Sequence, residues 1–288
     1  MTRKYIHKIA ALLTCHNRHI KTLACLDSLF KAALPDNFAV EVFLVDDKST
    51  DGTADVVEKK YPQVNVIQGD GNLYWNRGMN LAWQTAAEKL NYDFYLWLND
   101  DVVLDQDFIL NLINDYNNAG DSNTIIAGAC KSEKGNVTYS GYRDLKKKKI
   151  LSPSGKIQEC EYFNGNVVLI SNEVVKHVGF LDPVFHHGKG DFDYGLRARK
   201  KGVNLYVASV YVGTCELHNN LPKWCNPKYS FSERWKSFRS PLGGNPKMTY
   251  ILQRKYMGFF PAVFHYFTIH IRLLYPQLWT KRIGNINS

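Results

Sequence analysis

Apolar runs of four to six residues alternate with amphipathic patterns along the first 220 residues. The runs carry few polar positions, which is typical of strands that are buried on both faces. Between them, apolar residues recur at spacings of three and four, as in helices that pack one face on a sheet. This alternation predicts an α/β fold, with a mostly parallel, Rossmann-like sheet flanked by helices. The predicted strands are 9–13, 40–45, 64–67, 94–98, 167–170 and 205–208, and the predicted helices are 20–30, 53–61, 79–90, 173–178 and 193–200.

Composition narrows the class of protein. The chain has 288 residues, of which 45% are hydrophobic, enough for one large α/β domain with an appendage or for two small domains. Its six cysteines form no CxxC pair, so neither a zinc site nor a disulfide framework is indicated and a cytoplasmic location is expected. The run 9–13 is too short for a signal peptide, and no window of about 20 residues is free of charge and proline, which argues against a membrane span.

Basic residues are concentrated towards the carboxyl end of the chain. From Leu221 onward there are eleven Lys and Arg against one acid, Glu233, so this part carries +10 and the first 220 residues carry −1. The predicted domains are therefore 1–220, an α/β domain, and 221–288, a basic, aromatic helical extension. Such an extension favours an anionic partner. Because no nucleic-acid-binding motif is present, we expect an anionic membrane surface and no nucleic acid.

Acidic residues follow two of the predicted strands directly. Asp46 and Asp47 end one strand, and Asn99, Asp100 and Asp101 follow another. Turn chemistry and helix capping can explain either cluster alone. At the carboxyl edge of one parallel sheet, however, the two clusters would lie close together, and like charges are costly there unless a cation lies between them.

Four motifs resemble, in order, those of the family 2 inverting glycosyltransferases. They are residues 14–18 (TCHNR), 45–53 (VDDKSTDGT), 99–101 (NDD, a DXD-like motif) and 190–193 (GDFD), and the match covers roughly residues 6–220. The second and third motifs together are quite specific. The resemblance implies a GT-A fold, a nucleotide-sugar donor and a place in the rhamnosyltransferase-like group that builds bacterial surface glycans.

The resemblance also implies roles for individual residues. The expected nucleotide-binding residues are Thr14, Asn17, Asp47 and the neighbouring Asp46. Asp101 and Asn99 would hold Mg²⁺ or Mn²⁺ on the diphosphate, and Asp191 would be the catalytic base. Many family members have Glu at the position of Gly190, which leaves Asp191 and Asp193 as alternatives for the base. We favour Asp191, because Asp193 is expected to cap the following helix.

The chemistry of transfer agrees with these roles. A carboxylate at a strand end can accept the imide N–H of uracil or thymine. The diphosphate leaving group needs its growing charge neutralised, which a divalent cation does as a Lewis acid, and no Walker-type glycine loop is present to do it instead. A second carboxylate must remain as general base for the acceptor hydroxyl. Attack opposite to the leaving group inverts the anomeric centre.

Further candidates lie between and after these motifs. Arg77, in a Gly- and Asn-rich stretch before a helix, is expected to contact base or phosphate, and the alternative is an ordinary loop with a helix cap. Asn164 and Gly165 are expected near the sugar or acceptor, or form an ordinary turn. Asp100 and Asp193 complete the expected sugar and acceptor set. His218 is the candidate third metal ligand, against a surface histidine.

The sequence thus predicts a metal-dependent hexosyl- or deoxyhexosyltransferase. The donor would be a UDP- or dTDP-sugar, and the acceptor a hydroxyl of a glycan or lipid-linked glycan in surface polysaccharide synthesis. The enzyme would be peripheral at the inner face of the plasma membrane. One alternative is a sugar-phosphate nucleotidyltransferase, which usually has a glycine-rich loop after the first strand, where residues 14–18 contain no glycine. The other alternative is a non-catalytic sugar- or membrane-binding module.

Overall fold

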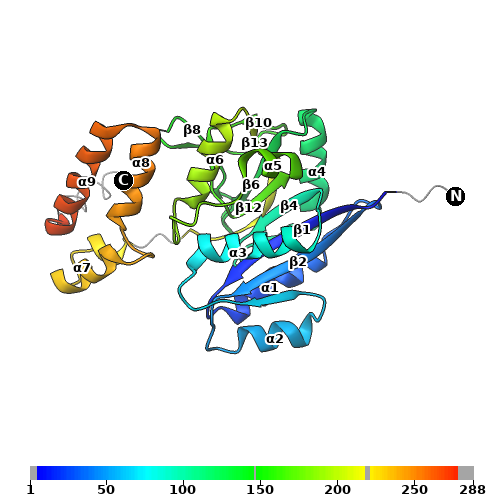
Figure 1. Cartoon of the computed structure of the whole chain (residues 1–288), viewed down its shortest axis with the longest axis horizontal. Coiled ribbons are helices and arrows are strands. Elements are labelled where there is room, and N and C mark those ends of the chain that lie inside the picture. Colours follow the sequence, from blue (N-terminus) through cyan, green and yellow to red (C-terminus); the bar gives the residue numbers. More distant parts are fainter. Residues whose placement is uncertain (1–4, 146, 218–220, 278–288) are drawn as a thin grey trace. The chain divides into compact units, whose positions relative to one another are not determined.

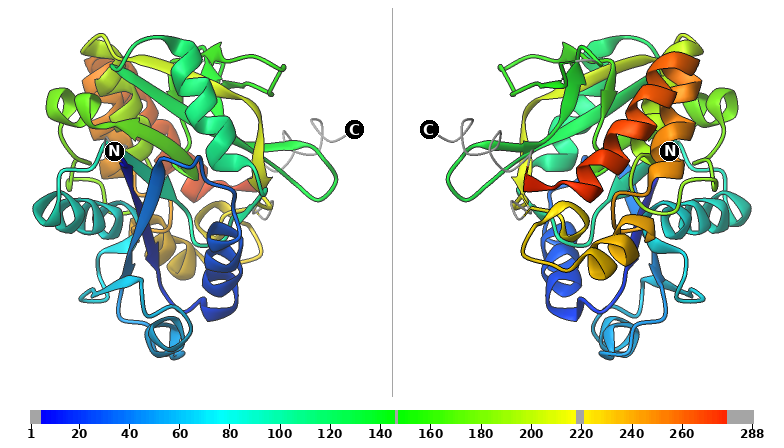
Figure 2. Two further views of the ribbon diagram at one scale, coloured as in Figure 1. Left: turned by 90° about the vertical axis from the view of Figure 1, so that its right-hand side faces the viewer. Right: turned by 90° about the vertical axis from the view of Figure 1, so that its left-hand side faces the viewer.

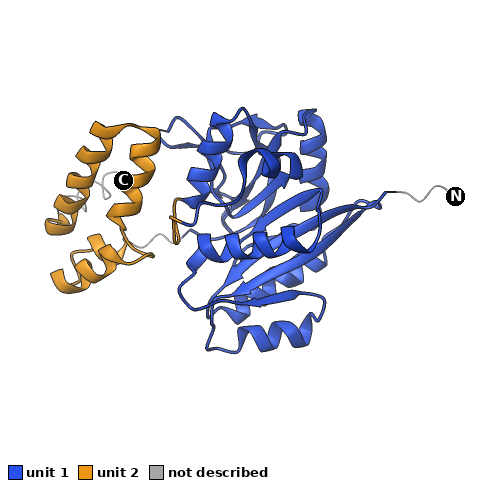
Figure 3. Ribbon diagram, viewed as in Figure 1, with its two compact units in different colours: residues 1–183, 190–217 blue, residues 184–189, 218–288 orange. Residues whose placement is uncertain are grey.

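Two compact units make up the chain. A computed structural model describes residues 5–145, 147–217 and 221–277. The first unit comprises residues 1–183 and 190–217, and the second comprises 184–189 and 218–288 (Figure 3). The second unit therefore includes the short segment 184–189, which the sequence pattern placed in the α/β domain.

The first unit is built on one large mixed sheet and a small three-stranded sheet (Figure 1). The large sheet has the order β10-β13-β6-β12-β4-β1-β2-β3, with β5 paired to β13 and β7 to β6. β12 runs antiparallel to both of its neighbours, whereas β1 runs parallel to β2 and β4. The small sheet has the order β11-β8-β9. The strands are β1 (His7–Cys15), β2 (Phe38–Asp46), β3 (Asn65–Gln68), β4 (Phe94–Leu98), β5 (Val103–Leu104), β6 (Thr124–Lys131), β7 (Val137–Tyr139), β8 (Gly141–Arg143), β9 (Lys149–Ile150), β10 (Gln158–Glu159), β11 (Tyr162–Phe163), β12 (Val167–Ser171) and β13 (Asn204–Thr214).

Helices cover both faces of the large sheet, which explains why its strands are apolar without alternation (Figure 2). In β1, Ile9 and Leu13 belong to the core beneath α1, α2 and α4, whereas Ala10 and Leu12 belong to the core beneath α3, α5 and α6. Successive side chains of one strand thus stabilise two separate layers. The helices are α1 (His19–Phe30), α2 (Thr53–Lys60), α3 (Tyr74–Lys89), α4 (Phe108–Ala119), α5 (Asn172–Val178) and α6 (Gly190–Lys200).

The fold class predicted from the sequence is confirmed, and each predicted helix and strand is present. Most ends shift by at most three residues, whereas α3 begins five residues earlier and β13 ends six residues later than predicted. The region between 103 and 163 holds additional elements that the pattern did not predict, among them α4, β6 and the small sheet. Most of these additional strands are only two or three residues long, too short for an alternation to be read from them.

Three helices form most of the described second unit: α7 (Phe231–Arg239), α8 (Pro246–Tyr256) and α9 (Phe259–Leu274), preceded by a short 3₁₀ helix, η1 (Lys223–Cys225). A capping box of Ser230 and Glu233 starts α7. The unit has its own apolar core, made of Trp224, Cys225, Phe238, Ile269 and Leu273. None of the helices in the described part of the chain is both long enough and apolar enough to cross a bilayer.

Candidate active site

The acidic segments meet at one edge of the large sheet. In the parallel pair β1 and β2, Cys15 lies beside Asp46, and in the antiparallel pair β4 and β12, Leu98 lies beside Val167. The loops that follow β1, β2 and β4 and the turn that precedes β12 therefore share this edge. We call it the acidic edge, and it is where open α/β sheets bind their ligands.

Asp47 fixes the loop between β3 and α3. Its Oδ1 accepts the N–H of Gly71 at 2.8 Å. Its Oδ2 accepts the N–H groups of Leu73 at 3.0 Å and Tyr74 at 2.9 Å. Gly69 packs so closely that a Cβ there would lie 2.7 Å from Oδ1. The buried Asp47 carboxylate is therefore engaged by backbone N–H groups, and the geometry does not favour the expected contact between this side chain and the nucleotide.

Asp46 keeps an acceptor that the protein does not use. Its Oδ1 accepts the N–H of Ser49 at 2.9 Å. In the described part of the chain no hydrogen bond is donated to its Oδ2. Asp46 is buried like Asp47, and of the two neighbouring acids it is the one with an oxygen that accepts no hydrogen bond from the described residues.

Thr14 and Asn17 shape the acidic edge through packing and loop contacts. Gly78 of α3 approaches Thr14 so closely that a Cβ would lie 2.3 Å from its Oγ1. Asn17 has a left-handed backbone (φ 53°), and its N–H donates to Ser49 Oγ at 2.9 Å. Its side-chain oxygen accepts the N–H of Thr50 at 2.7 Å. Asn17 thus joins the loop after β1 to the loop after β2, and contact of either residue with a nucleotide stays a prediction.

Arg18 lies between the two acids of the DXD-like motif. Its guanidinium donates to Asp100 at 3.1 Å and to Asp101 at 3.2 Å. Asp100 is buried and also accepts the hydroxyl of Thr22 at 3.2 Å. Burial raises the pKa of Asp100 to about 6, against the opposing effect of Arg18. Asp100 thus holds Arg18 in place. Because the side chain of Asp100 is buried, the structure does not support its expected contact with sugar or acceptor.

Asp101 and Asn99 are the candidate ligands of a divalent ion, and both contact other side chains. Asp101 is the more accessible of the two acids, and its Oδ1 also accepts the thiol of Cys215 at 3.7 Å. The side-chain oxygen of Asn99 accepts the indole N–H of Trp75 at 2.6 Å. Among the described residues no three His, Cys, Asp or Glu side chains gather as a metal site, and His218 lies outside them. Mg²⁺ is often held by one or two carboxylates with substrate phosphates, so Asp101 has the ligand type that such a site needs. Its two oxygens accept from Arg18 and Cys215 here, and metal binding stays a prediction.

Asp191 is brought to the turn that precedes β12. It lies in the first turn of α6, and its Oδ2 accepts the N–H of Gly165 at 3.1 Å while its Oδ1 accepts that of Phe192 at 2.9 Å. A Cβ on Gly165 would lie 2.6 Å from the ring of Trp75. Since Trp75 bonds in turn to Asn99, the candidate base is connected through Gly165 to the DXD-like motif.

Asp193 has a different role from the one expected. The helix begins at Gly190, so Asp193 lies inside α6, and the expectation that it caps this helix is wrong. Its side chain is fully buried and forms an ion pair with Arg197 at 3.4 Å. The Arg197 guanidinium also donates to the carbonyls of Val178 and Phe180, both at 2.7 Å. An enclosed side chain cannot contact an acceptor, so we do not propose Asp193 as a ligand.

Two other candidates contact the protein itself. The Arg77 side chain donates from Nε to the carbonyl of Pro183 at 2.9 Å, which ties the start of α3 to the segment before α6. The side-chain oxygen of Asn164 accepts the hydroxyl of Tyr142 at 2.8 Å. Both contacts position the backbone around the acidic edge, and direct contacts with base, phosphate or sugar stay predictions.

Arg18 and Trp75 are site residues that the sequence did not single out. Arg18 closes the TCHNR motif, and an arginine next to strand-end acids could have been read as their partner. Trp75 stands in a Gly- and Asn-rich stretch of the sequence, and in the structure it lies in the first turn of α3. Their partners in the fold come from distant segments, so spacing alone could not reveal the contacts.

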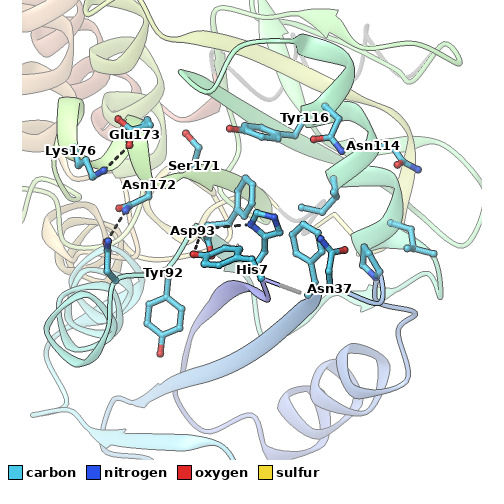
Figure 4. Close-up of a pocket in the computed structure, with 18 residues that line it drawn as sticks. His7, Asn37, Tyr92, Asp93, Asn114, Tyr116, Ser171, Asn172, Glu173 and Lys176 are labelled. Carbon is cyan, nitrogen blue, oxygen red and sulfur yellow. Dashed lines mark hydrogen bonds and ion pairs between the residues drawn. The ribbon is translucent and has the colours of Figure 1, made fainter. Parts of the chain in front are cut away.

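A second cleft, of about 620 Å³, lies at the opposite edge of the sheet (Figure 4). Its polar groups pair with one another: Tyr5 donates to Asp93 at 3.0 Å, His7 lies 3.6 Å from the same carboxylate, and Lys176 bonds to Glu173 at 2.6 Å. None of the predicted site residues lines this cleft. It lies at the amino ends of β1, β2 and β4, whereas ligands of such sheets bind at the carboxyl ends.

Known proteins share a sequence family and a fold with this chain. The family model for glycosyl transferase family 2 matches residues 11–176. A sequence comparison with curated proteins finds no match. Among solved structures, GalNAc-T7 with UDP, GalNAc and Mn²⁺ is 15% identical with a TM-score of 0.55, over 72% of this chain and 43% of that one. S. aureus TarS 1–349 in complex with UDP is 16% identical with a TM-score of 0.52, over 72% of this chain and 59% of that one.

These structural likenesses establish the fold, because their sequence identities are low, and the chain spans about half the length of the solved neighbours. The neighbours are GT-A glycosyltransferases, so the predicted GT-A architecture is confirmed. The family match includes β2, the DXD-like motif and the turn before β12, which together carry most of the acidic edge. With its family model matched over more than half of its length, the chain belongs to glycosyl transferase family 2.

Proposed function

We propose that the chain transfers a sugar from a UDP- or dTDP-sugar to a hydroxyl of a glycan or lipid-linked glycan, with inversion, in the synthesis of a surface polysaccharide. The observation that carries this proposal is the gathering of three acids with different surroundings at the acidic edge: Asp46, Asp101 and Asp191. Each has a distinct task in such a transfer, and the family and fold support the reaction class.

Asp46 would select the base of the donor. Its Oδ2 accepts no hydrogen bond from the described protein, and uracil and thymine both present an imide N–H that needs an acceptor. The loop that Asp47 anchors and the contacts of Asn17 hold the surroundings of this oxygen in place. A rigid frame of this kind reduces the ordering cost of binding.

Asp101 would hold Mg²⁺ or Mn²⁺ together with the donor diphosphate, and the ion would supply Lewis-acid stabilisation of the leaving group. Arg18, which lies 3.2 Å from Asp101, adds a positive charge at the same place. Asp191 would accept the proton of the attacking hydroxyl. The N–H groups of Gly165 and Phe192, which donate to its two oxygens, orient the carboxylate.

The expected result for the wild-type chain is Mn²⁺-dependent stabilisation by UDP or dTDP and turnover of one donor from a panel of nucleotide sugars. At a hundredfold excess over Kd, binding adds about 2.7 kcal/mol, or roughly 5–10 °C in melting temperature. Asp101→Ala should remove the extra stabilisation that Mn²⁺ gives to UDP, because it removes the metal-holding carboxylate. Asp105→Ala is the matched control, since this more exposed acid pairs with Lys131.

Two outcomes would contradict the assignment. If Mn²⁺ stabilises the UDP complex of Asp101→Ala as much as that of wild type, Asp101 is not the metal ligand. If no nucleotide or nucleotide sugar raises the melting temperature of the wild type, the chain is a non-catalytic module. Release of pyrophosphate from a nucleoside triphosphate and a sugar phosphate would instead identify a nucleotidyltransferase. We disfavour that alternative because residues 14–18, which include the end of β1 and the start of the following loop, contain no glycine.

We also propose that the enzyme works at the inner face of a membrane. One side of α9 exposes five large apolar side chains at spacings of four and three: Phe260, Phe264, Phe267, Ile271 and Leu274. Leu273 of the same helix is buried in the core of the second unit. Arg254 and Lys255 lie exposed at the end of α8, close to the start of α9 in the chain. Apolar side chains flanked by cations are typical of helices that lie in a headgroup layer.

Vesicle flotation tests this surface with point variants of the full chain. The wild type should float with phosphatidylglycerol vesicles at low salt, and much less with neutral vesicles. Phe264→Glu/Phe267→Glu should abolish flotation, because two acids replace apolar groups on the contact face. Ile20→Glu is the control, since Ile20 is 74% exposed on α1 of the first unit. Equal flotation of wild type and double variant would show that α9 does not bind the membrane.

A further inference from the structure

A pocket of about 690 Å³ lies among the helices of the second unit. This volume is in the range of small-ligand sites, roughly 300–1,000 Å³. All of its lining residues belong to the second unit, so it is distinct from the acidic edge. Each of the three helices contributes to its lining, which is Trp235, Phe238 and Arg239 of α7, Pro246, Lys247 and Tyr250 of α8, and Tyr266 and His270 of α9.

Aromatic rings form much of the pocket wall. Tyr250 and Tyr266 meet edge to face, with centroids 5.9 Å apart, and the ring of His270 lies 4.5 Å from that of Tyr266. The ring of Phe238, which is fully buried, meets the ring of His270 with centroids 4.9 Å apart. Trp235 remains 41% exposed. Apart from Phe238 these rings are partly exposed, and they form an aromatic surface on which the C–H face of a sugar ring can stack.

Two cations, Arg239 and Lys247, border these rings. The guanidinium of Arg239 lies 5.8 Å from the ring centroid of Trp235. No carboxylate of the described chain lies within 4.0 Å of either cation. Glu233 is the only acid in the sequence of the second unit, and it pairs with Lys223 at 3.2 Å. The pocket therefore combines aromatic surface with two cations that pair with no carboxylate of the described residues.

We propose that this pocket binds a phosphate-bearing carbohydrate, the anionic part of the acceptor glycan. A neutral glycan would make no use of Arg239 and Lys247, and a bare anion would make no use of the rings. The identification of the ligand as acceptor rests on the proposed function. A second binding point on the appended unit raises the local concentration of a growing glycan at the enzyme that extends it.

The pocket can be tested apart from the apolar side of α9. Its α9 residues are Tyr266 and His270, whereas the proposed membrane surface uses other positions of the same helix. Variants of Arg239, Lys247 and Trp235 leave that surface unchanged. Effects on carbohydrate binding and on vesicle binding are therefore separable.

Calorimetry on the full chain with glucose 6-phosphate, glucose and inorganic phosphate is the test. We expect glucose 6-phosphate to bind more tightly than either of the other two, because only it uses both rings and cations. Arg239→Gln/Lys247→Gln should lower its affinity by about tenfold or more, since hydrogen bonds to charged groups are lost. Trp235→Ala should reduce its affinity to that of inorganic phosphate. Lys228→Gln/Lys236→Gln is the control, with the same loss of charge in the same unit but outside the pocket.

The proposal is overturned if the pocket variant and the control bind glucose 6-phosphate equally. It is also overturned if the pocket variant loses only vesicle flotation and the wild type binds no soluble sugar phosphate, which would identify a lipid headgroup as the ligand. Melting temperatures of the variants exclude misfolding as the cause. If the pocket binds as expected but no nucleotide sugar is turned over, the proposed function fails while the carbohydrate site stands.

Discussion

Replacing Asp46 by asparagine is expected to shift the preference of the site from uridine diphosphate towards cytidine diphosphate. The variant keeps Oδ1, which accepts the N–H of Ser49, and places an amino group where Oδ2 was. That amino group opposes the imide N–H of uracil but can donate to N3 of cytosine. An unmatched buried donor costs about 1–3 kcal/mol, so UDP affinity should fall by about 10- to 100-fold while CDP affinity rises. Calorimetry with both nucleotides measures the shift.

Asp47→Asn serves as the comparison for this experiment. Both oxygens of Asp47 accept N–H groups from the loop 71–74, and an amide can replace only one of them. We therefore expect a lower melting temperature and weaker binding of UDP and CDP alike. If Asp47→Asn changes the base preference and Asp46→Asn does not, the base is contacted by Asp47, as first expected from the sequence.

Asp191→Asn is expected to slow transfer by about 10²–10⁴-fold with little change in UDP affinity. The amide has the size of the carboxylate and can still accept one N–H, from Gly165 or Phe192, but it cannot take the proton of the acceptor hydroxyl. The initial rate of transfer, measured with the identified donor and acceptor, reports the loss. Calorimetry with UDP shows whether the donor site is intact.

Asp193→Asn separates the base from its neighbour two residues later. Asp193 is buried beside Arg197, so the variant should lose stability, by about 1–3 kcal/mol, and retain the rate per folded molecule. The melting temperature reports this change independently of turnover. A dead but fully stable Asp193→Asn together with a nearly wild-type Asp191→Asn would show that Asp193 is the base.

The pattern of apolar residues in short segments determined the strands and helices of the first unit. The apolar runs that became β1, β2 and β4 and the three-four spacing of α1 and α3 can be read within windows of about ten residues, because burial on a sheet imposes its period on each segment. Their alternation limited the topology to a mostly parallel sheet and so placed Asp46 and Asp101 at one edge. The basic character of the second unit was also a property of composition alone.

The tertiary structure decided which of these acids has a free acceptor. Asp46 and Asp47 are neighbours of the same type, and only the return of the loop 69–74 onto Asp47 distinguishes them. Likewise, Asp191 faces Gly165 whereas Asp193 is enclosed with Arg197, a difference set by where α6 begins. Sequence spacing cannot specify such contacts, because hydrogen-bond partners from distant segments meet only when the chain packs. The availability of a carboxylate is therefore a property of the fold, and its presence at the strand end is a property of the sequence.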